Sequence, residues 1–297
     1  MASLKEIKGR IASIQNTQKI TSAMRMVASA KLHRAQGMTE KFLRYRDSLQ
    51  SIVESLGGQT LPSPIPEQSS PFPTGKGRRR SGSIVLVPIS SNSGLCGAFN
   101  SNIAKATFKR MNELQSQGIQ VKPLPIGKKI THELKKADID CNLVYFNLLE
   151  KIEKGGDLVE VDFLMEFALQ LYQSGEIDGI EFIYHHFKSM GSQIITITPI
   201  PLEAPTIQEK EDDTFLTEPS PVELLASLFP RLLNAQTYGI LLDSLASEHA
   251  ARMMAMQTAD DNANELLKEL TLLYNKTRQQ AITNELIDIM GGQTEKR

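Results

Sequence analysis

The distribution of proline constrains this chain most. All 14 prolines lie between Pro62 and Pro230, so residues 1–61 and 231–297 contain none. Proline inside a helix removes a hydrogen bond and clashes with the preceding turn, which costs about 3 kcal/mol or more. Two long proline-free ends therefore predict helical arms on either side of a domain built from strands and loops.

The first arm opens with a capping box, in which Ser3 can accept from the backbone N–H of Glu6. Gly57-Gly58 supplies a stop. Between them, apolar residues recur in steps of three and four, which is typical of a coiled-coil seam. The seam residues are Leu4, Ile7, Ile11 and Ile14, then more weakly Thr21, Met24 and Ala28, then Ala35, Met38, Phe42, Tyr45, Leu49, Ile52 and Leu56.

The second arm opens with an N-cap serine, a proline at the first helical position and a glutamate at the third, in Ser220-Pro221-Val222-Glu223. We expect Pro230 to kink or break the helix near Phe229, and Gly291-Gly292 to end it. Its seam reads Leu242, Ala246, His249, Met253, Met256, Asp260, Ala263, Leu267, Leu270, Tyr274, Thr277 and Ala281. Arms of about 55–60 residues would be about 85–90 Å long and must bury their stripes, most simply against each other and antiparallel.

The middle of the chain alternates predicted strands with predicted helices. This pattern favours an α/β, Rossmann-like domain with a mostly parallel sheet. The expected strands are 83–90, 119–126, 142–146, 179–187 and 193–202, and the expected helices are 100–117, 128–136 and 158–174. The predicted organisation is an N-terminal shaft helix 1–58, a linker 59–75, the α/β domain 76–205, an acidic linker 206–220 and a C-terminal shaft helix 221–297.

Charge and composition exclude several classes of protein. The formal net charge of −1 gives no overall field that would favour nucleic acid or a membrane surface. The first fifty residues nevertheless carry ten Lys/Arg against three acids, which fits either a solvated helix face or a basic shaft that meets acidic partners or nucleic acid. No aromatic residue interleaves with those charges before Phe42, which argues against binding of single-stranded nucleic acid. We find no bilayer-spanning apolar run and no targeting segment at the start, so we expect a protein of the cytoplasmic side or a mature, already cut form.

Residues that could carry chemistry are few. The segment 90–100, with Gly94 and Gly97, follows a predicted strand but lacks a dinucleotide or P-loop signature, so we interpret it as a tight turn. His185 and His186 should point to opposite faces of a strand, which makes a shared metal ion improbable. Cys96 and Cys141 are interpreted as reduced, buried small side chains. We expect no catalytic set, no metal and no cofactor. The residues alone also allow a scaffold or adaptor coiled coil, or a nucleotide-binding enzyme with helical arms.

Three separated motifs resemble the gamma subunit, the central rotor shaft, of F-type ATP synthases. The first is 11–28, IASIQNTQKITSAMRMVA, and the second is 94–100, GLCGAFN. The third is 247–256, SEHAARMMAM, followed by 274–279, YNKTRQ, and 282–285, ITNE. Order, spacing and length agree along essentially the whole chain. The sequence departs from many relatives at Asn92-Ser93, where they have an acidic–basic pair, and at Arg25, where some have an acid.

The resemblance implies a non-catalytic, hetero-oligomeric rotary shaft that couples a proton-driven membrane ring to conformational cycling of catalytic subunits. Its implied partners are the alpha and beta head subunits, the epsilon subunit and the ring of c subunits, with no nucleic acid and no direct membrane insertion. It also implies a peripheral protein on the cytoplasmic face of a bacterial inner membrane. The positions that match head contacts are Met24, Arg25, Arg252, Gln279, Thr283 and Glu285, and those that match ring contacts are Phe215 and Glu218.

Overall fold

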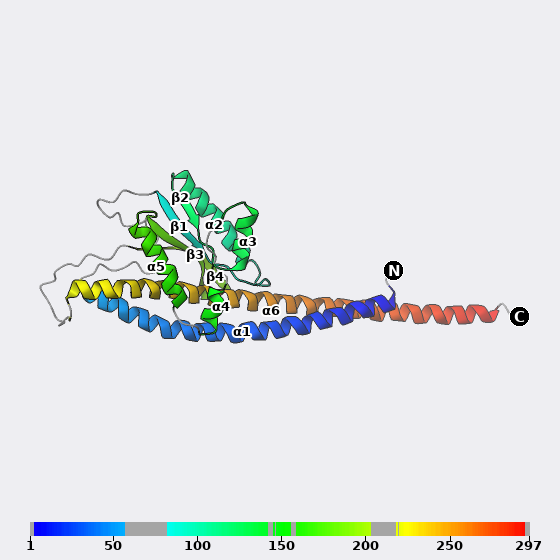
Figure 1. Ribbon diagram of the computed structural model, residues 1–297. Coiled ribbons are helices and arrows are strands. Elements are labelled where there is room, and N and C mark those ends of the chain that lie inside the picture. Colours follow the sequence, from blue (N-terminus) through cyan, green and yellow to red (C-terminus); the bar gives the residue numbers. More distant parts are fainter. Residues whose placement is uncertain are drawn as a thin grey trace. The chain divides into compact units, whose positions relative to one another are not determined.

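The computed structural model describes residues 3–56, 82–141, 145, 147–155, 159–202, 218 and 220–294. The chain forms two units: Met1–Ala28 together with Arg252–Arg297, and Ser29–Ala251. The first unit holds one segment of each long terminal helix. The second holds the remaining parts of these helices and an α/β domain (Figure 1).

The two long helices confirm the predicted arms. Helix α1 spans Leu4–Ser55 and helix α6 spans Pro221–Thr294. Both N-caps form as expected, because Ser3 Oγ accepts from the Glu6 N–H at 3.2 Å and Ser220 Oγ accepts from the Glu223 N–H at 3.4 Å. The stop at Gly57-Gly58 lies outside the described residues, as do the linker 59–75 and most of 206–220. The predicted domain boundaries therefore stay predictions.

Helix α6 differs from expectation at both of its expected interruptions. It continues through Pro230 without a break, and it passes Gly291-Gly292 to end at Thr294. Burial explains the first difference, because Phe229 is 6% exposed and Leu232 is fully buried, so packing on both sides of the proline holds the helical path. A bend of the helix axis near Pro230 stays a prediction.

Four described strands form one sheet in the order β2-β1-β3-β4. Their bounds are β1 Ser83–Pro88, β2 Gln120–Pro123, β3 Gly179–Ser189 and β4 Ser192–Ile200. Strand β1 is parallel to both of its neighbours, whereas β3 and β4 form an antiparallel hairpin. The prediction of a mostly parallel sheet is confirmed.

The edge beyond β2 is less regular than the sequence pattern predicts. Strand β2 stops at Pro123, and Ile126 makes only isolated parallel bridges to Ile89 and Tyr145. Pro123 and Pro125 lack the N–H donors that a continuous ladder needs. The expected strand 142–146 lies outside the described residues apart from Tyr145. A short helix that was not predicted, α4 (Leu148–Glu153), follows.

Helices cover both faces of the sheet. Helices α2 (Phe99–Ser116) and α3 (Lys128–Lys136) pack on one face, where Leu86 and Ile183 of the sheet meet Ile103, Ile130 and Leu134. Helix α5 (Val159–Gln173) contributes the buried Met165, whose sulfur accepts a hydrogen bond from Thr237 of α6 at 3.1 Å. In Figure 1, α5 and α6 lie on the other side of the sheet from α2 and α3.

The two consecutive histidines of β3 point to opposite faces of the sheet, as predicted. The His185 ring stacks on Phe99 of α2, with centroids 4.3 Å apart, and its Nε2 lies 3.0 Å from the Phe99 carbonyl. The His186 Nδ1 lies 2.6 Å from Asp243 Oδ2 of α6. Burial lowers the pKa of His185 despite its bond to the Phe99 carbonyl, so the ring is held neutral inside the domain.

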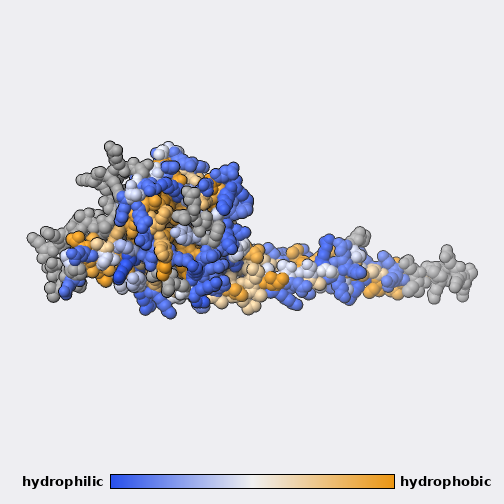
Figure 2. Space-filling model, viewed as in Figure 1, coloured by the Kyte–Doolittle hydropathy of each residue, from blue (hydrophilic) through white to orange (hydrophobic). Residues whose placement is uncertain are grey.

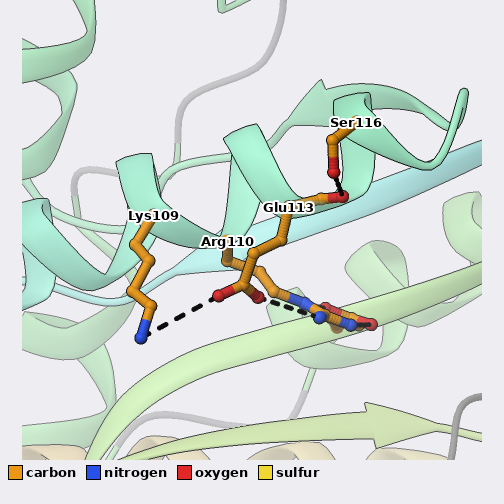
Figure 3. Close-up of polar contacts among 5 residues, drawn as sticks. Lys109, Arg110, Glu113 and Ser116 are labelled. Carbon is orange, nitrogen blue, oxygen red and sulfur yellow. Dashed lines mark hydrogen bonds and ion pairs between the residues drawn. The ribbon is translucent and has the colours of Figure 1, made fainter.

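One buried ion pair joins α2 to the sheet. Arg110 donates from Nε and Nη2 to the two oxygens of Glu181, at 2.8 and 2.7 Å, and the Glu181 side chain is 3% exposed. Figure 3 shows how Glu113, one turn further along α2, approaches the same guanidinium, at 3.3 Å from Nη1. These bonds raise the pKa of Arg110, led by the bond to Glu181. Two-pronged pairing of this kind fixes the helix at one position on the strand.

Candidate partner-binding surface

The six positions that match head contacts all fall in the same unit, Met1–Ala28 with Arg252–Arg297. Met24, Arg25 and Arg252 are half-buried, whereas Gln279, Thr283 and Glu285 are exposed. Thr283 Oγ1 donates to the Gln279 carbonyl one turn earlier, at 2.9 Å, so both side chains lie on one side of α6. The structure therefore divides the predicted contacts into a half-buried group and an exposed group.

Two polar bridges join the helices in this unit and show that they are antiparallel. Gln18 Nε2 donates to Asn264 Oδ1 at 2.7 Å, and Arg25 Nη1 donates to Gln257 Oε1. Moving seven residues forward in α1, from Gln18 to Arg25, moves the partner seven residues back in α6, from Asn264 to Gln257. This register confirms the predicted antiparallel pairing of the two terminal helices here.

The same register leaves the end of α6 as a single helix. Leu4, the first residue of α1, lies fourteen residues before Gln18, so its level on α6 is residue 278, fourteen residues after Asn264. Helix α6 continues to Thr294. We call the segment 279–294 the tip. Gln279, Thr283 and Glu285 all lie on it, beyond the reach of the described part of α1.

Apolar side chains are unusually exposed in this unit. More than half of the exposed large apolar side chains that the structure describes lie here, although this is much the smaller unit. They are Ile20, Met26, Val27, Met254, Leu266, Leu272, Leu273, Ile282, Leu286, Ile287 and Met290. Figure 2 shows orange, apolar surface among the blue along the described shaft helices. Exposed apolar patches of this extent mark surfaces that meet other proteins.

The tip arranges its apolar side chains on one side of the helix. Ile282, Leu286 and Met290 follow one another at intervals of four residues and are 49%, 56% and 70% exposed. Ile287, at 60%, widens the stripe. A lone amphipathic helix of this length is marginal in water, so its stripe needs an apolar surface to cover it.

Comparison with known proteins decides the family. A family model described as ATP synthase matches residues 3–294. The chain is 47% identical to the ATP synthase gamma chain of Parabacteroides distasonis and 44% identical to that of Bacteroides fragilis strain ATCC 25285. These alignments cover 98% of this chain in both cases, and 98% and 99% of the relatives.

The chain belongs to the ATP synthase gamma chain family.

A solved structure of an ATP synthase supports the fold of this gamma-family chain. The chain resembles one chain of the Euglena gracilis mitochondrial ATP synthase (OSCP/F1/c-ring, rotational state 3), with a TM-score of 0.66 at 18% identity. The match covers 98% of this chain and 93% of that one. The likeness extends over both long helices and the domain between them.

The second group of predicted contacts is only partly described in this gamma-family chain. Glu218 is exposed, just before α6, whereas Phe215 lies outside the described residues. The pairing of these two positions with a membrane ring stays a prediction.

The loop 90–100, interpreted above as a tight turn without a nucleotide-binding signature, has several polar groups engaged inside the gamma-family domain. Ser90 Oγ and Asn92 Oδ1 accept from the N–H groups of Ile130 and Lys128, at 2.9 and 3.0 Å, and so cap α3. Asn100 Nδ2 donates to Ser91 Oγ at 2.8 Å. These bonds tie the loop to α3 and to the first turn of α2. The loop is a structural turn, as predicted.

Several functional-group predictions need qualification. Cys96 is buried, but Cys141 is only half-buried, and both thiols are free. Burial raises the pKa of the Cys141 thiol.

Among the described residues, no cluster of three or more His, Cys, Asp or Glu could hold a metal ion. None of the helices in the described ranges is sufficiently long and apolar for a membrane span.

Sequence reasoning missed a charged cluster around α4. Glu153 Oε1 lies 2.8 Å from Lys31 Nζ of α1 and 3.4 Å from His249 Nε2 of α6. The sequence pattern places His249 in the seam of the helix pair, yet its ring also meets a carboxylate from a third helix. The sequence gives no periodic signal at Glu153, because α4 is only six residues long and lies in a stretch that the sequence pattern assigns to a loop.

Proposed function

We propose that this chain is the central rotary shaft of an F-type ATP synthase. It couples rotation of the proton-driven membrane ring to conformational cycling of the catalytic subunits, which carry the ATP chemistry. The observation that carries this proposal is the tip of α6. It is a single helix with a stripe of exposed apolar side chains, beside a two-helix segment that is itself rich in exposed apolar residues.

The mechanism is mechanical. A rotating body can change the affinities of three surrounding catalytic sites only if it contacts them differently. The helix pair offers different faces, because α1 presents Ile20, Met26 and Val27, whereas α6 presents Leu266 and Leu272. Each rotation step would bring a different face to a given subunit. No bond is made or broken in the shaft.

The proposed partners are the alpha and beta head subunits, the epsilon subunit and the c-subunit ring. The tip would turn inside an apolar sleeve of the head. Arg252, Gln279, Thr283 and Glu285 would contact the catalytic subunits, with Met24 and Arg25 beside them. Glu218 and Phe215 would face the ring. With such partners, the chain would be a peripheral protein on the cytoplasmic face of a bacterial inner membrane.

The decisive experiment is reconstitution. The purified full-length chain is mixed with the alternating head subunits of an F-type synthase, and the gel-filtered complex is assayed for Mg-ATPase activity. We expect stoichiometric capture and stimulated hydrolysis. Absence of capture by head subunits that are competent with another gamma chain would overturn the proposal and favour an adaptor coiled coil.

The contact residues are tested in the complete synthase reconstituted into sealed vesicles, where a proton gradient drives ATP synthesis. Arg252→Ala and Gln279→Ala should each lower coupled ATP synthesis, because each removes a charged or polar partner of the head. His132→Ala, at an exposed position of α3 in the other unit, is the matched control. If the two variants and the control give the same rates, Arg252 and Gln279 do not contact the catalytic subunits.

A further inference from the structure

The two interhelical bridges of the shaft share one geometry. Gln18 and Arg25 lie one heptad apart in α1, and their partners Asn264 and Gln257 lie one heptad apart in α6. Residues separated by seven positions return to the same side of a coiled coil. The bridges therefore stand in line along one side of the helix pair.

The apolar seam at this level is thin. Among the described side chains of this unit, the buried ones are Ile7, Ala28, Met256 and Ala263, and two of these four are alanines. Between the bridges the predicted seam residues are Thr21 and Met24 in α1, and Asp260 and Ala263 in α6. Two of these four are polar and one is an alanine. Thr21 uses its hydroxyl to donate to the Gln18 carbonyl at 3.0 Å. Small and polar seam residues interlock weakly, so apolar packing discriminates poorly between alternative registers.

The second bridge is oriented by a neighbour. Gln257 Nε2 donates to Asp261 Oδ1 at 2.9 Å, one turn further along α6. This bond fixes the amide so that Oε1, its acceptor atom, faces Arg25. A guanidinium has donors only, so it requires that orientation.

We infer that Gln18–Asn264 and Arg25–Gln257 set the register of the antiparallel shaft, and that all four are positioning residues. A slip of one heptad keeps the apolar stripes in phase but breaks this pattern. A slip in one direction brings Arg25 level with Asn264 but leaves Gln18 level with Thr271. A slip in the other direction brings Gln18 level with Gln257 but leaves Arg25 without an amide. Only the observed register places both side chains opposite an amide.

This inference changes the role of Arg25. Its guanidinium is engaged with α6, so it would act on a catalytic subunit through the position of the shaft. A one-heptad slip displaces one helix by about 10 Å relative to the other, which would misplace every contact on the tip. That consequence for coupling rests on the proposed function. The register itself is a property of the isolated chain and is tested there.

The test uses two pairs of introduced cysteines in the full-length chain. Ile14→Cys with Leu267→Cys reports the observed register, because Ile14 lies four residues before Gln18 and Leu267 is the seam residue at the matching level of α6. Ile14→Cys with Tyr274→Cys reports a slip of one heptad. A short bis-maleimide joins the thiols, and peptide mass spectrometry maps each cross-link, so Cys96 and Cys141 do not confuse the result.

With the bridges intact, we expect the first pair to cross-link and the second to do so weakly. Adding Gln18→Ala and Arg25→Ala should raise the ratio of slipped to observed cross-link about tenfold, as expected for losing two hydrogen bonds of ordinary net strength. The matched control is Gln15→Ala with Asn16→Ala, which removes two exposed polar side chains from the same helix and should leave the ratio unchanged.

An exchange variant separates positioning from simple destabilisation. Gln18→Asn with Asn264→Gln keeps an amide on each helix, so it should retain the native ratio when the alanine variants do not. If Gln18→Ala with Arg25→Ala loses helix content, Gln18→Ala alone carries the test, with a rise of about threefold. An unchanged ratio in a helical variant would show that the apolar seam sets the register.

Discussion

Asp243 of α6 holds two consecutive residues of β3 at once: its Oδ2 lies 2.6 Å from His186 Nδ1, and its Oδ1 accepts from the Phe187 N–H at 2.8 Å. One carboxylate of α6 thus ties this helix to the β3–β4 hairpin. We expect Asp243→Ala to lower the free energy of unfolding of the α/β domain by about 1–3 kcal/mol, because a half-buried N–H loses its acceptor. Loss of hydrogen-exchange protection at the Phe187 amide would report this directly. Asp243→Asn keeps one acceptor and should lose less; equal losses in both variants would contradict this account.

Gly127 precedes α3 at a φ of 100°, and a Cβ placed there would lie 2.1 Å from the Ser90 carbonyl oxygen. Gly127→Ala should therefore destabilise the domain by several times the roughly 1 kcal/mol that positive φ alone costs an alanine. Gly118→Ala is the control, since its φ is +75° but nothing lies within 4 Å of the added methyl. Urea unfolding of the two variants separates the clash from the backbone preference. Similar midpoints would mean that the loop around Ser90 moves aside.

Removing one partner of the Arg110–Glu181 pair leaves an uncompensated charge against the sheet. Arg110→Ala should cost about 3–5 kcal/mol, whereas Arg110→Met combined with Glu181→Leu should recover most of that loss. Lys109→Ala, at an exposed lysine 3.9 Å from Glu113, should change stability by less than about 0.5 kcal/mol. Thermal denaturation of the three variants tests the order. A double replacement as unstable as Arg110→Ala would show that the guanidinium matters for packing more than for charge.

His185 should make the domain sensitive to acid. Its folded-state pKa is lowered by burial, whereas the unfolded chain titrates near the ordinary value of 6.5. The unfolded state therefore binds more protons in the window between the lowered pKa and 6.5, and stability present above that window is lost as pH falls through it. Measuring the free energy of unfolding between about pH 7.5 and about pH 5 for wild type and His185→Gln isolates this contribution. Parallel pH profiles would assign the acid sensitivity to other groups.

The apolar stripe of the tip should contribute more to head binding than its polar neighbours. Leu286→Asp places a charge in the proposed sleeve and should weaken capture by the head subunits at least about tenfold. Thr283→Ala removes a hydroxyl that already donates to the Gln279 carbonyl, so it should weaken capture much less. A binding titration with both variants gives the comparison. Equal weakening would indicate that the tip is held by specific polar contacts.

Much of this architecture follows from local chemistry that the sequence displays. The absence of proline from both ends, the two serine caps and the alternation of His185 and His186 each have one dominant physical cause, and each prediction is confirmed. The register of the helix pair could not be predicted in the same way. The seam from Ile11 to Ala28 repeats with a constant period, so the pattern alone fits several alignments until Gln18 and Asn264 are seen together.

The missed features depend on tertiary contacts. Pro230 predicts an interruption by local rules, but packing of Phe229 and Leu232 keeps the helix intact. Glu153 lies in a short helix with no periodic signal, and its pairing with Lys31 and His249 depends on residues far away in the sequence. Nor does any sequence pattern show that Arg25, a predicted contact, is bonded to Gln257.

The burial profile of α6 determines how variation along it should be interpreted. From Leu232 to Ala250 almost every side chain is buried, whereas from residue 279 onward the described side chains are nearly all exposed. In a saturation-mutagenesis map of the whole helix, intolerance in the first stretch would report folding of the domain. Intolerance to substitution in the second, exposed stretch could not be explained by folding of the domain. Each intolerant position there would mark a side chain that contacts another subunit of the complex.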